Sequence, residues 1–230
     1  MTTQVVILAA GLGTRLGRPI PKSLTELSDG RTIMARQFAA VETALGEDAR
    51  VSVVVGFKLG LVLEAFPEAL FVYNDAYDRT NTSKSLLRAL RLSAPGGVLW
   101  MNGDVVFDAE LLVRLQPYIE KDVSFIAVNT AAVGDEEVKY LVDDDGFVTG
   151  LSKQVQGGLG EAVGINYVSS ADKPALVARL AQVGDQDYFE RGIELAIDED
   201  GIEVTPIDIS DLFAVEVDFA ADLERANQHV

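Results

Sequence analysis

The chain has 230 residues, 48% of them hydrophobic and 24% charged, which suits one compact α/β domain with a sizeable core. Its 36 acidic and 19 basic residues give a net charge of −17, and a surface of this charge repels nucleic acid and anionic membranes, so we expect neither as a partner. Cysteine is absent and the single histidine is His229, which we expect to be frayed and silent, so thiol, Ser-His and Cys-His mechanisms are excluded.

Short apolar runs alternate with segments of helical periodicity through the first half of the chain. The runs are typical of strands buried on both faces of a parallel sheet. We expect these strands at residues 4–10, 51–55, 69–74, 97–104 and 123–129. The helices between them are expected at 32–45, 60–66, 83–92 (with Ser83 as N-cap) and 108–119. This alternation predicts a doubly wound, mostly parallel, Rossmann-like sheet in a three-layer α/β/α arrangement.

The pattern changes in the second half of the chain. Residues 138–153 predict a β-hairpin around an Asp-Gly turn, and 160–169 predict another strand. We then expect two helices at 172–183 and 186–198, two strands at 202–210 and 213–218, and a last helix at 219–228. No repeat or linker interrupts the chain, so we expect a single domain over 1–230 with a β insertion at 130–170. The first apolar run lacks a charged flank and is too short for a signal peptide or membrane span, which predicts a cytoplasmic protein.

A glycine-rich loop, AAGLGTRLG, follows the first predicted strand. It lacks the third glycine of a dinucleotide fingerprint, because Leu16 stands there, and Lys22 stands where a Walker A loop needs its second glycine. Gly11 and Gly13 permit positive φ and let backbone N–H groups approach a phosphate. Arg15 can fork onto phosphate oxygens and Lys22 adds a point charge. The alternative is a structural turn with solvated basic residues.

This loop, followed by PIPKSL, resembles the nucleotidyltransferases that make activated sugars and alcohols, with their signature G-x-G-[ST]-R-[LM] and a later P-K. The resemblance implies that Mg²⁺ is the cofactor and that Asp104, at the end of a buried strand, is one of its ligands. It implies Asp218, before the last helix, as the second ligand, with Glu216 as a weaker third candidate. A helix N-cap is the alternative role for Asp218.

Three later segments resemble the phosphocholine cytidylyltransferase-like subgroup, which includes enzymes that activate aminoalkylphosphonates. They are NDAYDRTNTSKSLLRAL, VKYLVDDDGFVTGLSK (with Val138 where the family has Met) and GEAVGINYVS, so the resemblance spans nearly the whole chain. The implied catalytic residues are Arg15 and Lys22. The implied nucleotide-binding residues are Leu8, Ala9, Ala10, Gly11, Gly13, Thr14, Arg15, Lys22, Asn81, Ser85 and Gly103. The implied acceptor-binding residues, contributed in part by the insertion, are Lys139, Lys153, Glu161 and Tyr188.

The resemblance implies transfer of CMP from CTP to a small phosphorylated amino alcohol or an aminoalkylphosphonate, with release of pyrophosphate. A phosphomonoester has a second pKa of about 6, so the acceptor needs no general base, which suits a chain with one histidine. The alternatives are a hexose-1-phosphate uridylyl- or thymidylyltransferase and a silent nucleotide-binding regulatory domain. The expected partners are a nucleoside triphosphate and the small acceptor, and a homodimer stays open.

The acceptor head group is not decided by the sequence. A choline head favours an aromatic cage, whereas a primary amine favours carboxylates. The aromatic candidates are Trp100, Tyr77, Phe107, Tyr167, Tyr188 and Phe189. We expect Trp100 to belong to the core, because it lies within an apolar strand. Turn or solvated positions are the alternatives for Asn81, Lys139, Lys153 and Glu161.

Overall fold

The computed structural model describes residues 2–131 and 137–230, and the part of the 130–170 insertion at 132–136 lies outside the described residues. The strands are β1 (Gln4–Ala9), β2 (Arg50–Val55), β3 (Leu70–Tyr73), β4 (Val98–Asn102), β5 (Val105–Phe107), β6 (Phe125–Asn129), β7 (Lys139–Val142), β8 (Val148–Ser152), β9 (Glu161–Val168), β10 (Thr205–Asp208) and β11 (Ala214–Glu216). The α-helices are α1 (Ile33–Leu45), α2 (Leu59–Ala65), α3 (Thr82–Leu92), α4 (Ala109–Glu120), α5 (Lys173–Gln182), α6 (Phe189–Asp200) and α7 (Ala220–His229).

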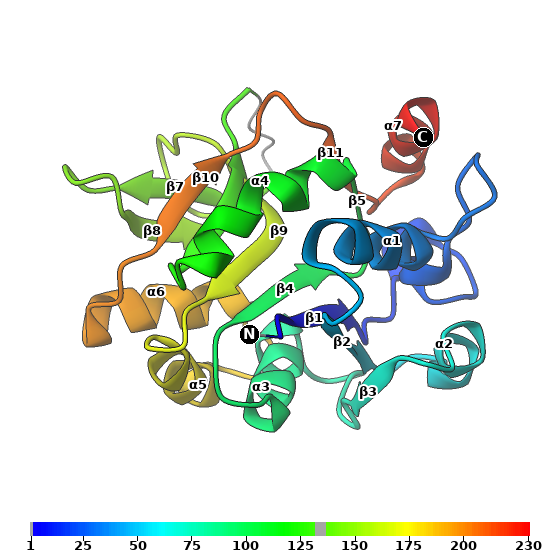
Figure 1. Cartoon of the computed structure of the whole chain (residues 1–230), viewed down its shortest axis with the longest axis horizontal. Coiled ribbons are helices and arrows are strands. Elements are labelled where there is room, and N and C mark those ends of the chain that lie inside the picture. Colours follow the sequence, from blue (N-terminus) through cyan, green and yellow to red (C-terminus); the bar gives the residue numbers. More distant parts are fainter. Residues whose placement is uncertain (1, 132–136) are drawn as a thin grey trace.

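A mixed sheet with the strand order β10-β6-β9-β4-β1-β2-β3 runs through the molecule (Figure 1). Strands β4, β1, β2 and β3 are parallel, and β9 is antiparallel to both of its neighbours, β4 and β6. The start of β9 therefore lies at the same edge as the end of β4. The predicted doubly wound, mostly parallel α/β fold is confirmed.

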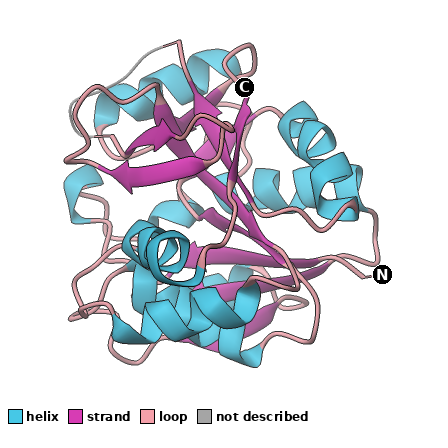
Figure 2. Ribbon diagram, turned by 90° about the vertical axis from the view of Figure 1, so that its left-hand side faces the viewer, coloured by secondary structure: helices cyan, strands magenta, loops and turns pink. Residues whose placement is uncertain are grey.

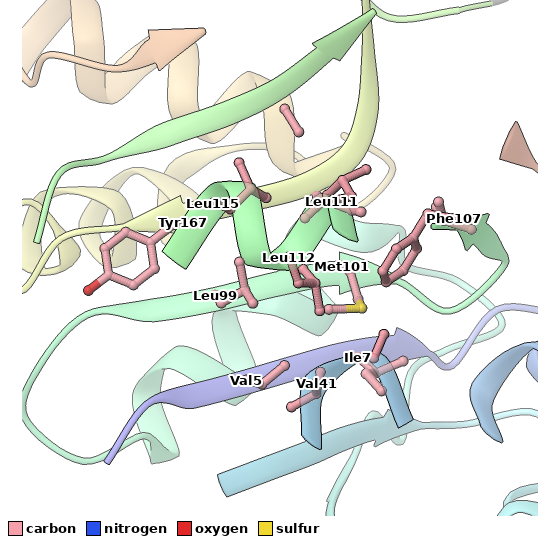
Figure 3. Packing of buried hydrophobic residues seen from close by; sticks show 14 of the residues in the cluster. Val5, Ile7, Val41, Leu99, Met101, Phe107, Leu111, Leu112, Leu115 and Tyr167 are labelled. Carbon is pink, nitrogen blue, oxygen red and sulfur yellow. The ribbon is translucent and has the colours of Figure 1, made fainter. Parts of the chain in front are cut away.

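Helices cover both faces of this sheet (Figure 2). On one face α1, α2 and α4 pack on residues such as Ile7, Leu99 and Met101, all fully buried (Figure 3). On the other face α3, α5 and α6 pack on the alternate side chains of the same strands, including Val6 and Trp100. Successive residues of β1 and β4 thus point to opposite cores, which explains the continuous apolar runs of the sequence.

The 130–170 segment is built into the sheet rather than attached at its edge. β9 lies between β4 and β6, and the β7–β8 hairpin extends from it through the pairing of Lys139 with Glu161. The Asp-Gly turn predicted within the hairpin is present. Gly146 has a φ of 88°, and the side chain of Asp143 accepts hydrogen bonds from the N–H groups of Asp145 and Phe147.

Three local expectations were wrong. The N-cap of α3 is Asn81, whose side chain accepts a hydrogen bond from the N–H of Thr82, and Ser83 is buried in the first turn. His229 is not frayed, because its ring stacks on Phe213 at 3.9 Å and its Nε2 lies 2.7 Å from Asp108 Oδ1. The short strand β5 was not expected at all, because its three residues follow a polar turn and directly precede a helix.

No helix within the described ranges is both long enough and apolar enough to cross a membrane.

Candidate active site

A cleft of about 300 Å³ opens at the carboxyl ends of β1 and β4, beside the start of β9 and the start of α6. This is the edge at which open α/β sheets bind their ligands. Most of the predicted site residues line it, namely Leu8, Ala9, Gly11, Gly13, Thr14, Arg15, Lys22, Asn81, Gly103, Asp104, Lys153, Tyr188 and Asp218. Ala10, Ser85, Lys139 and Glu161 are not among its lining residues. Residues that the sequence did not indicate also line the cleft, among them Ser23, Asn102, Glu137, Gly164 and Glu190.

The glycine-rich loop depends on Gly13 more than on Gly11. Gly13 has a φ of 61°, and a Cβ at this position would lie 2.8 Å from Lys22 Cγ, so only glycine fits. Gly11 does not have a positive φ, which corrects the expectation for it, and a Cβ there would meet no atom within 4 Å. The open side of Gly11 faces the cleft, where it leaves room for a ligand to approach the backbone.

Lys22 lies between two carboxylates at the centre of the cleft. Its Nζ donates to Asp104 Oδ2 at 2.9 Å and to Asp218 Oδ1, and Arg15 Nη1 reaches Asp218 Oδ2 at 2.7 Å. Burial disfavours the ammonium, but Asp104 and Asp218 outweigh it and raise the pKa of Lys22 above its usual value. Lys22 is therefore a permanent cation that brings the two carboxylates together.

Strand pairing and two side chains hold these carboxylates in place. β5 and β11 pair antiparallel, and the N–H of Val217 donates to the carbonyl of Asp104 at 2.9 Å. Gln37 of α1 donates from its Nε2 to the carbonyls on both sides of Asp104, those of Asn102 and Val105, each at 2.9 Å. These hydrogen bonds thus hold the backbone at Asp104 and the residue next to Asp218 in place.

The turn that carries Asp218 is fixed by α7. Asp222 accepts hydrogen bonds from the N–H groups of Asp218 at 3.1 Å and of Phe219 at 2.7 Å. Phe219 is the N-cap of α7, so the alternative that Asp218 is the cap residue was wrong. The carboxylate of Asp218 is left to contact Lys22 and Arg15.

Glu216 is the third acid of the cleft. Its Oε1 accepts a hydrogen bond from Asn102 Nδ2 at 2.6 Å. Gly164, with a φ of 72°, makes room for this pair, because a Cβ there would lie 2.7 Å from both atoms. Burial, together with the nearby charge of Asp104, raises the pKa of Glu216 to about 8. The fold thus favours the protonated form of the Glu216 carboxyl more than water does.

The end of the cleft remote from the glycine loop combines one lysine with a second buried acid. Lys153 Nζ lies 5.6 Å from the centre of the Tyr188 ring, within the range of a cation–π contact. Glu190, in the first turn of α6, is 8% exposed, and burial raises its pKa to about 7 against the opposing effect of Lys153. Sequence reasoning missed Glu190 because a helical acid is usually a solvated residue.

The remaining predicted residues lie close to the cleft or behind it. Lys139 and Glu161 are paired across β7 and β9, near the rim. Ser85 is buried behind the cleft, where its Oγ accepts a hydrogen bond from Asn74 Nδ2 at 3.0 Å. Asn81 is anchored through its N–H, which donates to the carbonyl of Asp185 at 2.8 Å.

The six aromatic candidates do not all converge. Tyr188 and Phe189 line the cleft, and Phe189 is only 1% exposed. Trp100 is in the core, as expected, with its ring edge-on to Phe189 at 5.6 Å, and Phe107 and Tyr167 are buried in the opposite core. Tyr77 packs beside Gly56, outside the set of lining residues.

The donor set fits a small divalent cation such as Mg²⁺. Asp104 and Asp218 converge on one cation, the ammonium of Lys22, and carboxylate oxygens are the ligands that Mg²⁺ prefers. Within residues 2–131 and 137–230, no group of three or more His, Asp or Glu side chains is arranged to hold a metal ion. A metal at this place would thus rest on two protein carboxylates, with substrate oxygens and water completing its coordination.

The chain is similar to several known proteins. The family model described as a MobA-like NTP transferase domain matches residues 5–141, more than half of the chain. The 2-aminoethylphosphonate cytidylyltransferase of Lancefieldella rimae is 28% identical over 232 residues, covering 96% of this chain and 88% of that protein.

Two larger relatives are matched over only about a third of their length. The CMP-5'-(3-aminopropyl)phosphonate synthase of Streptomyces rubellomurinus is 28% identical over 250 residues, covering 97% of this chain and 38% of that protein. The bifunctional protein GlmU of Acidithiobacillus ferrooxidans is 33% identical over 157 residues, covering 66% of this chain and 33% of that protein.

A solved structure shares the whole fold. The CTP:phosphocholine cytidylyltransferase of Streptococcus pneumoniae superposes with a TM-score of 0.75 at 17% identity, covering 100% of this chain and 99% of that one.

Proposed function

From the premise that this chain belongs to the family of MobA-like NTP transferase domains, we propose that it is a Mg²⁺-dependent cytidylyltransferase. The proposed reaction transfers CMP from CTP to a small acceptor that carries a phosphate or phosphonate and a cationic amine, with release of pyrophosphate. The predicted nucleotidyltransferase class is confirmed by the family match, whereas the base and the acceptor are the proposed part. The observation that carries the proposal is the cluster of Lys22, Asp104 and Asp218 beside the glycine loop.

The proposed reaction is an in-line displacement. An oxygen of the acceptor phosphate or phosphonate forms a bond to the α-phosphorus of CTP while the bond to the bridging oxygen breaks, and the electron pair leaves with pyrophosphate. The acceptor oxygen is already anionic, so no side chain has to remove a proton. The barrier lies in bringing two anions together, which positive charge at fixed positions lowers.

Each residue of the cluster has a role in this proposal. Arg15 and Lys22 bind and orient the triphosphate, and the loop backbone around Gly13 approaches its oxygens. Asp104 and Asp218 would hold Mg²⁺, whose chemistry when bound is to neutralise charge on the phosphates. Lys153 directly follows β8 in what we propose is a single domain, and it would bind the acceptor phosphate or phosphonate.

The acceptor class is supported by the charges of the cleft. Two acids that the proposed metal site does not use, Glu137 and Glu190, line the cleft together with Lys153. A zwitterion with an anionic and a cationic end complements this arrangement better than a hexose 1-phosphate, which has no cation. Two enzymes named for aminoalkylphosphonates match nearly the whole of this chain, over 88% and 38% of their own lengths, and they support the same class.

The test is a matrix of four nucleoside triphosphates against 2-aminoethylphosphonate, phosphoethanolamine, phosphocholine and glucose 1-phosphate, with pyrophosphate release as readout. We expect turnover with CTP and an amine-bearing acceptor, and loss of it in EDTA. Asp104→Asn should lower kcat by at least about a hundredfold with little change in melting temperature. Turnover only with glucose 1-phosphate would support the sugar alternative, and no turnover with any pair would refute the proposal.

A further inference from the structure

The carboxylate of Glu190 is the most unusual polar group of the cleft. It is 8% exposed, and its Oε2 has no hydrogen-bond partner among the residues that the structure describes. Two nearby charged residues act on its carboxyl: Lys153 favours the ionised form, and Glu194 opposes it. A buried carboxylate oxygen without a donor is costly, so such groups in folded proteins normally meet a donor from water or a ligand.

The charged side chains near Glu190 have other partners, so its Oε2 is left to bind a ligand. Glu194 is already bound, because its Oε1 accepts from the N–H of Leu151 at 3.1 Å and its Oε2 pairs with Arg191 at 3.1 Å. Lys153 lies against the ring of Tyr188. Glu190 is a lining residue of the cleft, so a donor that enters from the substrate side comes next to this side chain.

We propose that Glu190 binds the ammonium group of the acceptor and selects a primary amine over a trimethylammonium group. This inference rests on the proposed function. A primary ammonium has three N–H donors and can satisfy Oε2 with a charge-assisted hydrogen bond. A trimethylammonium has none, and burying it against Glu190 would leave the carboxylate oxygen without a donor.

The aromatic side chains of the cleft do not compensate for that loss. Quaternary ammonium groups are recognised by several aromatic faces together. Here Phe189 is almost fully buried, and the face of Tyr188 already has the ammonium of Lys153 over it. Lys153 and Glu190 instead provide one cation and one anion for the two ends of a zwitterionic acceptor.

The test compares two matched pairs of acceptors at saturating CTP and Mg²⁺. Each pair is a primary amine and its N-trimethyl counterpart, namely phosphoethanolamine with phosphocholine, and 2-aminoethylphosphonate with its trimethylated form. The variants are Glu190→Gln, which keeps the shape of the side chain, and Asp198→Asn, an exposed position on the same helix, as a control. Melting temperatures check that both variants are folded.

We expect the wild type to prefer the primary amine of each pair. Glu190→Gln should raise KM for the primary amines roughly tenfold to a hundredfold, with KM for CTP unchanged and with little effect on the trimethylated acceptors. Asp198→Asn should leave all of these values near wild type. Equal KM changes for both members of a pair, or no change, would overturn the role of Glu190 while leaving the proposed function intact. Absence of turnover with all four acceptors would instead refute the proposed function.

Discussion

The buried Glu190 links the stability of the fold to pH. Its pKa is raised from 4.5 to about 7 in the folded chain. Between these values the unfolded chain loses a proton that the folded chain keeps, so the free energy of unfolding falls as pH rises through this window. The full contribution, about 3 kcal/mol, is present below pH 4.5 and is lost above pH 7.

We therefore expect Glu190→Gln, which cannot ionise, to lose this pH dependence. Urea unfolding at pH 5 and pH 8 measures it: the wild type should lose clearly more stability between the two than the variant. Asp198→Asn, at an exposed position on the same helix, is the control and should follow the wild type. Parallel profiles for wild type and Glu190→Gln would show that Glu190 titrates normally.

The ammonium of Lys22 lies between the carboxylates of Asp104 and Asp218, where we propose that Mg²⁺ binds. We therefore expect that removing this ammonium changes metal binding. Lys22→Met leaves Asp104 and Asp218 facing each other without the ammonium that bridges them, although Arg15 still pairs with Asp218, so we expect a melting temperature in EDTA that is lower by about 5 °C. Mg²⁺ should then stabilise this variant more than the wild type, because in the wild type it competes with the ammonium.

Differential scanning fluorimetry over a Mg²⁺ titration measures this effect without requiring turnover. Lys121→Met, at an exposed position after α4, is the control and should match the wild type. An equal Mg²⁺ shift in Lys22→Met and in the wild type would mean that the metal does not bind between the two carboxylates.

At the scale of elements, α1 positions the turn between β4 and β5 through one side chain. Gln37 is 1% exposed and donates to two carbonyls that flank Asp104. Gln37→Leu removes both donors and leaves those carbonyls unpaired, so we expect a loss of about 2 to 3 kcal/mol in stability. The kcat should fall as well, because Asp104 is no longer fixed.

A matched control for this change is Thr43→Ala on the same helix. Its hydroxyl is exposed and bonds only to the carbonyl of Ala39, so stability should change by less than about 0.5 kcal/mol. Chemical denaturation and steady-state kinetics measure both variants. A Gln37→Leu enzyme with wild-type kcat would show that strand pairing alone holds Asp104.

The sequence predicted the elements whose signals are local. Continuous apolar runs marked β1 and β4, and the Asp-Gly turn marked the hairpin. The resemblance to nucleotidyltransferases implied that Lys22 and Asp104 belong to one site, at the sheet edge where open α/β folds bind ligands. The sequence could not show that β9 enters the sheet between β4 and β6, since strand order depends on pairing between distant segments.

The residues that the sequence missed act through contacts far apart in the chain. Gln37 lies 65 residues from Asn102, and Gly164 matters only because Glu216 and Asn102 meet beside it. Asn102 could have been found, because it directly precedes Gly103 and Asp104 in a strand that ends in polar residues. The burial of Glu190 has no such signal in the chain.

At the scale of the whole molecule, charge is distributed unevenly around the cleft. The chain carries a net charge of −17, yet Arg15 and Lys22 both line the cleft, where we propose that the nucleotide binds. The long-range field of the protein therefore repels a nucleotide that the local field attracts. Which field governs association depends on distance, because salt screens exposed charges beyond about 8 Å at physiological ionic strength.

We expect kcat/KM for CTP to rise about two- to fivefold as NaCl is raised from about 10 mM to about 150 mM. Over this range the Debye length shrinks from about 30 Å to about 8 Å, which screens the repulsive surface before the contacts inside the cleft. Steady-state rates at constant free Mg²⁺ measure this salt dependence. The control is kcat/KM for a zwitterionic acceptor, which has little net charge and should change little. A steady fall for CTP would mean that the basic loop, rather than the acidic surface, controls how nucleotides arrive.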